Sequence, residues 1–312
     1  MRPRFESDYR TLFWAFVLFP LLPALSYARP ALLLWLLPAQ LYLSYCCGVL
    51  THNQVHCKTF AGQRANLIYA SWLSVFYGAP IATWIPTHLL NHHRFPDRER
   101  DVTRSYRLSA QHNLWQALRY TLLCGSWELP LVFEHARRAR QRRDRVWREL
   151  RVQLVALPLA HLGALGLALH LHGAVLGSAV YLLSMGTAFL APYFMFFTNY
   201  IQHVHCDPDS PHDYCRNFVS PAANWLIFQN GYHTVHHDQP NVHWSRYPAL
   251  HAARSSSIHP SLNQASLFGF CIANYLLRPL SARWGTVPLR SLAPRSSPAR
   301  AAALPLQSLP QL

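Results

Sequence analysis

The sequence predicts an all-α integral membrane protein: four transmembrane helices in two hairpins, with a cytosolic helical cap that holds a histidine-rich site for two metal ions. Three observations predict this class. Hydrophobic residues make up 51% of the 312 residues. Charged residues make up only 13%, where a soluble domain has about 25%. Eight of the 19 histidines fall into three short clusters. This composition excludes intrinsic disorder and is untypical of a simple soluble enzyme.

The first hairpin is expected at residues 11–28 and 30–51. Neither stretch contains Asp, Glu, Lys or Arg, and Arg29 is the only charged residue between them. A spanning helix needs about 20 mostly apolar residues, so each stretch is long enough to cross a bilayer. The connection between the two helices must be very short.

The second hairpin is expected within residues 152–206, which are also uncharged. We place its helices at 152–170 and 174–198, with the polar break between them as the turn. A fifth uncharged stretch, 66–86, contains two prolines. For this stretch a full span and a re-entrant or interfacial segment both stay open.

Basic residues predict the orientation, because they concentrate on the cytoplasmic side of a membrane protein. Residues 136–151 are densely basic, and the N-terminal segment holds three arginines before the first span. The two connections inside the hairpins contain only Arg29. Both termini and the middle region 52–151 are therefore expected in the cytosol, with the basic run against anionic lipid headgroups. No nucleic acid is expected as a partner, since no fold that binds it is recognisable.

Three histidine clusters lie on the side expected to be cytosolic. They read HNQVH, HLLNHH and HTVHH and comprise His52, His56, His88, His92, His93, His233, His236 and His237. Each three-histidine pattern would arise by chance only about 0.07 times in a chain of this composition. Residues three or four apart share a helix face, so we expect such members of a cluster to bind one metal. His93, directly after His92, should face a second metal.

Imidazole suits iron, zinc, copper and nickel, and eight histidines are too many for one tetrahedral ion. The clusters HNQVH, HLLNHH and GYHTVHH, interleaved with two hydrophobic hairpins, resemble the integral-membrane fatty acid desaturase superfamily over residues 11–250. The resemblance implies a mushroom-shaped protein with a non-haem di-iron centre in its cap. It also implies a further ligand from an Asn-x-x-x-His element after the fourth span. Asn199 and His203 match that element, His203 as a ligand and Asn199 as one that acts through water.

The resemblance defines residues 1–278 as one desaturase-like domain. Residues 279–312, rich in Pro, Ser, Ala and Arg, are expected to be a disordered tail. His205 and His243 are candidates for positions beside the ligands. The acids of the loop after the fourth span could orient ligating imidazoles. We prefer to interpret them as solvated loop residues; they are Asp207, Asp209 and Asp213.

The activity that the resemblance implies is O2-dependent oxidation of an aliphatic or fatty acyl chain by two iron ions, with formation of a C=C double bond. Hydroxylation, and decarboxylation to a terminal alkene, stay open because no residue decides among them. The sequence after the third cluster is similar to bacterial branches of the superfamily, so we expect a bacterial inner membrane. A non-oxidative membrane zinc protein is a distant alternative, since HExxH is absent and hydrolytic zinc sites keep only three protein ligands.

Electrons are expected from a separate ferredoxin- or cytochrome-type protein with its reductase. The seven cysteines form no pattern that is typical of an iron–sulfur cluster or a disulfide framework. The remaining expected partners are a lipid or fatty acyl substrate and the membrane lipids.

Overall fold

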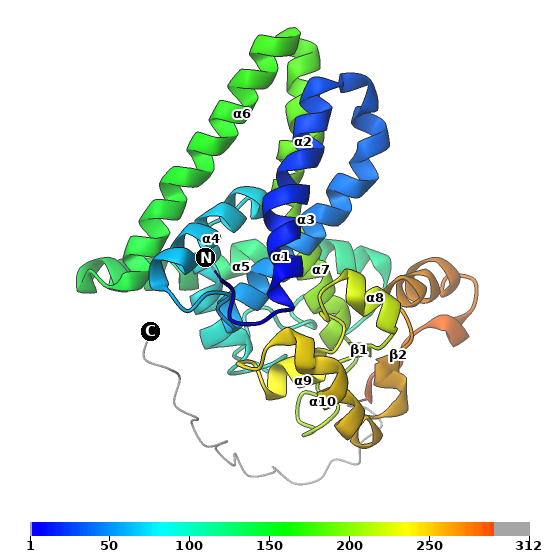
Figure 1. The fold of residues 1–312 in the computed structure, drawn as a ribbon. Helices are drawn as coiled ribbons and strands as arrows, with labels where there is room; N and C mark the ends of the chain where they lie inside the picture. Colours follow the sequence, from blue (N-terminus) through cyan, green and yellow to red (C-terminus); the bar gives the residue numbers. More distant parts are fainter. Residues whose placement is uncertain (1, 290–312) are drawn as a thin grey trace.

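The computed structural model describes residues 2–289, which are mostly helical (Figure 1). The N-terminal elements are α1 (Asp8–Phe13), η1 (Trp14–Leu18), α2 (Phe19–Ala28), η2 (Pro30–Leu32), α3 (Leu33–His56), α4 (Gln63–Tyr77), η3 (Ile81–Thr83) and η4 (Ile85–His92). The central elements are α5 (Leu114–Arg142), α6 (Arg145–Leu183), η5 (Met185–Leu190) and α7 (Ala191–His203). The C-terminal elements are β1 (Asn217–Phe218), α8 (Pro221–Leu226), α9 (His233–Asp238), η6 (Trp244–Arg246), α10 (Tyr247–Arg254), η7 (Ser255–Ser257), η8 (Pro260–Leu262), β2 (Asn263–Gln264), α11 (Leu267–Cys271), η9 (Ile272–Leu277) and η10 (Ala282–Trp284).

The first hairpin consists of α1, η1 and α2 on one arm and α3 on the other, joined at Arg29 (Figure 1). The arms Asp8–Ala28 and Pro30–His56 are 21 and 27 residues long and apolar enough to cross a membrane. Their outer side chains have no protein neighbours to bury them; Trp35 is 84% exposed. Such a large apolar surface is stable against lipid tails and unfavourable in water.

The second hairpin is formed by α6, which folds back on itself at Gly173 (Figure 1). Gly173 has φ 73°, a left-handed conformation that suits glycine. The reversal falls within the polar break where the turn was expected. With η5 and α7, α6 gives a third apolar stretch, Arg145–His203. The two hairpins are tied together by Tyr27, whose hydroxyl donates to the Ala164 carbonyl at 2.9 Å.

The fifth uncharged stretch, 66–86, is not one helix. α4 ends after 15 residues at Gly78, which has φ 73°, and the chain then turns through η3 into η4. A Cβ atom at Gly78 would lie 2.7 Å from the Cα atom of Phe189, so only glycine fits there. Of the helices in residues 2–289, those that are long and apolar enough to span a membrane are the three stretches above, and α4 is not among them.

The other described residues form one body at the base of both hairpins (Figure 1). This body departs from the expected all-α class in a two-stranded parallel sheet, in which Asn217 pairs with Asn263 and Phe218 with Gln264. The start of the expected tail packs against this body, because Thr286 Oγ1 lies 2.7 Å from Nδ1 of His112. The packed chain therefore continues past the expected boundary at 278, and the tail from 290 onward lies outside the described residues.

Candidate metal centre

The histidines predicted as metal ligands converge on two neighbouring clusters. They come from the ends of α3 and α7, from η4 and its C-cap, and from α9. The first cluster consists of His52, His56, His88, His93 and His236, and the second of His92, His203, His233 and His237. Within each cluster the possible ligand atoms all lie within 4.8 Å of one another. The chain thus offers two adjacent all-imidazole sites.

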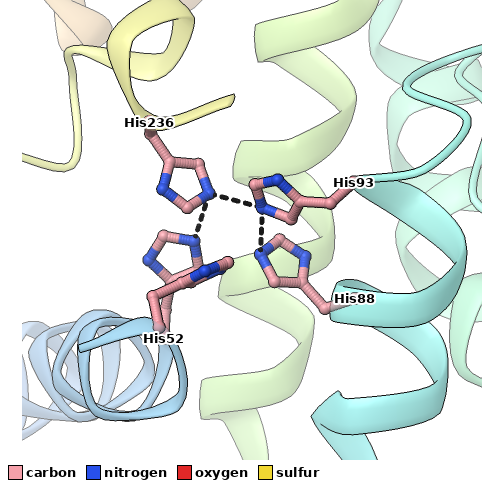
Figure 2. Close-up of side chains that lie close together, drawn as sticks. His52, His88, His93 and His236 are labelled. Atoms are coloured by element: carbon pink, nitrogen blue, oxygen red, sulfur yellow. Dashed lines mark hydrogen bonds between the residues drawn. The ribbon is translucent and has the colours of Figure 1, made fainter. Parts of the chain in front are cut away.

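In the first cluster the imidazoles point at one another from three separate chain segments (Figure 2). Nε2 of His236 lies 2.9 Å from Nε2 of His52 and 2.8 Å from Nε2 of His93. Nε2 of His93 lies 3.2 Å from Nε2 of His88. With metal–nitrogen bonds of about 2.1 Å, two ligands at right angles would have nitrogens about 3.0 Å apart. These spacings fit imidazoles around one ion.

The second cluster has the same spacing. Nε2 of His233 lies 2.9 Å from Nε2 of His203 and 3.1 Å from Nε2 of His237. Nε2 of His92 is buried, and no described residue forms a hydrogen bond with it. A buried polar atom without a partner is costly, so its free lone pair indicates a metal ligand. Both ring nitrogens of His56 in the first cluster are buried without a partner in the same way.

The pairing of histidines within two of the sequence clusters differs from the expectation. His88 and His92, four residues apart, lie in different metal clusters, and His88 shares its cluster with His93. The cause is that η4 is a π-helix, in which residues five apart share a face. In the third sequence cluster, HTVHH, His233 and His237 belong to the second spatial cluster and His236 belongs to the first. The expected grouping was therefore wrong for HLLNHH and HTVHH, whereas His52 and His56 of HNQVH do lie together.

Asp101 is a buried acid at this centre that the sequence reasoning missed. It is 0% exposed, and its Oδ2 lies 2.7 Å from Nδ1 of His92. Burial raises the pKa of Asp101, but His92 and the hydroxyl and amide of Thr103 outweigh burial and lower the pKa to about 2. The carboxylate therefore accepts the Nδ1 proton of His92 and leaves Nε2 free for a metal. The only signal was an acid in an Arg-rich loop, nine residues after His92.

Burial also sets the charge state of the histidines outside the spans. It lowers the pKa of each ring well below the ordinary value, and the neighbouring imidazoles lower it further; these residues are His88, His93, His233, His236 and His237. The rings are therefore neutral at physiological pH. Neutral imidazole is the form that binds metals.

The remaining predicted residues lie outside both clusters. Nδ2 of Asn199 donates to the hydroxyl of Tyr120 at 2.9 Å. His205 contacts Thr286, with Nδ1 2.9 Å from Oγ1, and Nε2 of His243 lies 3.2 Å from Oδ1 of Asp8. Neither histidine is thus placed beside a ligand set. The acids of the loop after α7 bond within the loop or to the backbone beside it; they are Asp207, Asp209 and Asp213.

A cavity of about 120 Å³ opens beside both clusters. Its walls include His52 and His88 of the first cluster and His92 and His233 of the second. Most of the exposed wall is apolar, and Asn199 lies on it. Cavities with mostly apolar walls and a few polar groups are typical of small-molecule sites. A ligand in this cavity would lie next to both clusters.

Comparison with known proteins gives a match to a family model. The model of the fatty acid desaturase family matches residues 27–261 of the chain. No curated protein and no solved structure matches it. The matched region contains all nine clustered histidines and the second arm of the first hairpin.

Proposed function

Because the chain belongs to the fatty acid desaturase family, we propose that it is an O2-dependent oxidoreductase with two iron ions that introduces a C=C double bond into a fatty acyl chain. Family membership makes it an oxidoreductase. The observation that carries the finer proposal is the pair of adjacent histidine clusters, with five and four imidazoles, on one cavity. Hydrolytic zinc sites keep three protein ligands, which disfavours a hydrolase.

The nine clustered histidines would hold the metals. The first ion would take His52, His56, His88, His93 and His236, and the second His92, His203, His233 and His237. Iron bound there would supply the activation of O2 and the removal of hydrogen from an unactivated methylene. The protein's own part is to keep the imidazoles neutral and oriented, as Asp101 does for His92. Asn199, on the cavity wall, would act on the metals through water.

The cavity would place the acyl chain. Apolar and aromatic side chains such as Trp84, Met195 and Phe196 line it and would hold methylenes beside the metals. The same walls exclude bulk water from the reacting carbons. One binding site would thus hold the acyl chain and bring the methylene that loses hydrogen next to the metals.

The hairpins would anchor the enzyme in a bacterial inner membrane. Four spans follow if each arm of both hairpins crosses the bilayer, and the basic residues at the α5–α6 junction would keep the metal centre and both termini in the cytosol. Electrons would come from a separate ferredoxin- or cytochrome-type protein with its reductase.

Elemental and product analysis tests this proposal. The purified protein should contain about two iron ions per chain, and iron-loaded protein with O2, a reductase system and an acyl substrate should yield a product lighter by two hydrogens. Gain of one oxygen, or loss of a carbon, would replace desaturation by hydroxylation or decarboxylation. Zinc that persists in iron-supplemented cells, without iron, would overturn the oxygenase proposal.

A further inference from the structure

Glu128 is the only Asp, Glu, Lys or Arg among the described residues that line the cavity beside the metal clusters. It is half-buried on the inner face of α5, one to three turns after the buried residues Ala117, Thr121 and Cys124. Leu122 and Phe133, on other faces of α5, are each 68% exposed. The helix therefore directs a carboxyl group into a site whose other walls are largely apolar.

No cation balances this carboxyl. Within residues 2–289 Glu128 forms no ion pair, and it belongs to neither histidine cluster. Its polar neighbour is Thr87, which directly precedes His88. Burial raises the pKa of Glu128 to about 8; Asp101 adds to this rise, and the contact with Thr87 opposes it.

When a hydrocarbon fills the cavity, the carboxyl of Glu128 loses water on the side that faces the chain and, among the described residues, keeps only its hydrogen bond with Thr87. Burial of a polar group without a hydrogen bond is unfavourable, and a substrate that satisfies the group is selected over one that does not. We infer that the substrate is an aliphatic chain that carries a hydrogen-bond donor, a hydroxyl or an amine, and that Glu128 accepts this hydrogen bond. This inference rests on the proposed function, since it assumes that the cavity is the substrate site.

The place of the donor follows from the same geometry. Thr87, the neighbour of Glu128, precedes the ligand His88 on η4, and both line the cavity. A donor held by Glu128 would therefore lie close to the metals, and the oxidised carbons would be near the polar group. Glu128 would then determine both which chain is accepted and where it is oxidised.

Binding to three chains of equal length tests the inference: dodecane, dodecanol and dodecylamine. Titration of the metal-loaded protein in lipid nanodiscs, as wild type, Glu128→Gln and Glu128→Leu, gives affinities that do not depend on turnover. Glu134→Leu, on the exposed part of the same helix, is the matched control. The metal content of every variant shows that its centre is intact.

Wild type should bind the alcohol or the amine at least tenfold more tightly than the alkane, and Glu128→Leu should abolish this preference. If Glu128→Gln retains alcohol binding and loses amine binding, the donor is a charged amine, which needs the carboxylate. If Glu128→Gln retains both, a neutral hydrogen bond such as that of a hydroxyl is enough.

Equal binding of all three chains by wild type, or the same preference in Glu128→Leu, would overturn the inference. Equal loss of turnover on every substrate with unchanged binding would also overturn it, because Glu128 would then serve the reaction itself. Protein from iron-supplemented cells that holds zinc, without iron, and still shows the preference would refute the oxygenase proposal but not this one.

Discussion

At the scale of single residues, neighbours in the third sequence cluster, HTVHH, belong to different candidate metal sites. His236 lies in the first cluster and His237 in the second. We predict that His236→Ala and His237→Ala each lose the ion of one cluster and retain part of the other, so that metal content falls from about two to about one per chain. Each variant should lose product formation and still insert in the membrane. The exposed His170 at the hairpin tip provides the control His170→Ala. Complete loss of metal in both variants would mean that the clusters fold as a single unit.

Asp101 should affect metal affinity without touching a metal. Asp101→Asn weakens the acceptor for Nδ1 of His92, which is 2.7 Å away, so Nε2 becomes a poorer ligand. Loss of such a partner typically lowers metal affinity tenfold to a hundredfold, as measured by competition with a chelator. Glu99→Gln, in the same loop on an 81% exposed side chain, should leave affinity unchanged. Activity of Asp101→Asn should return at high iron concentration if the fold is intact.

Glu128 should make stability depend on pH. Its pKa is about 8 in the folded protein against an ordinary 4.5, so the folded state retains a proton that the unfolded chain releases. The stability that this proton provides is complete below the unfolded pKa and is lost as pH rises through about 8. Thermal unfolding midpoints should therefore fall between mildly acidic and alkaline pH, by about 2–4 °C for each kcal/mol lost. In Glu128→Gln, which does not titrate, the fall should be smaller; an identical fall would assign the effect to other groups.

At the scale of elements, histidine spacing predicted which histidines come together, but not which of the two spatial clusters each one belongs to. Spacing arguments assume the α-helical period, and η4 departs from it because it is a π-helix. The wider turn of η4 is a feature of its backbone, and the spacing of His88, His92 and His93 did not reveal it. Asp101 was missed for a similar reason, since only the folded loop brings it to His92.

The turn before η4 should be sensitive to a single methyl group. Gly78 and Gly173 both have φ 73°, where a non-glycine residue costs roughly 1–2 kcal/mol. A Cβ at Gly78 would also meet backbone atoms of Ala188 and Phe189 at 2.7–2.8 Å, whereas nothing lies within 4 Å of one at Gly173. Gly78→Ala should therefore lower the thermal midpoint clearly more than Gly173→Ala, and should also reduce metal content by moving η4. Equal effects of the two variants would show that backbone strain alone limits this turn.

At the scale of the whole molecule, the uncharged runs predicted both hairpins because a bilayer excludes charge along a whole span. The length of the packed chain was harder to predict, since the contacts of Thr286 with His112 and His205 join segments far apart in sequence. We predict the orientation from charge alone: the α5–α6 junction is rich in exposed arginines such as Arg137, whereas the first hairpin tip has only Arg29.

Orientation can be measured with single cysteines and a membrane-impermeant thiol reagent. The seven native cysteines are all free, with only Cys57 and Cys271 less than fully buried, so replacing these two leaves little background. In that protein Arg29→Cys should react only from the outer side of the membrane, and Arg137→Cys, at a 66% exposed position, only from the cytosolic side. The physical reason is that the reagent cannot pass the bilayer and the first hairpin must cross it completely to place residue 29 outside. Reaction of both positions from the same side would mean that this hairpin does not span, and the four-span arrangement would be wrong.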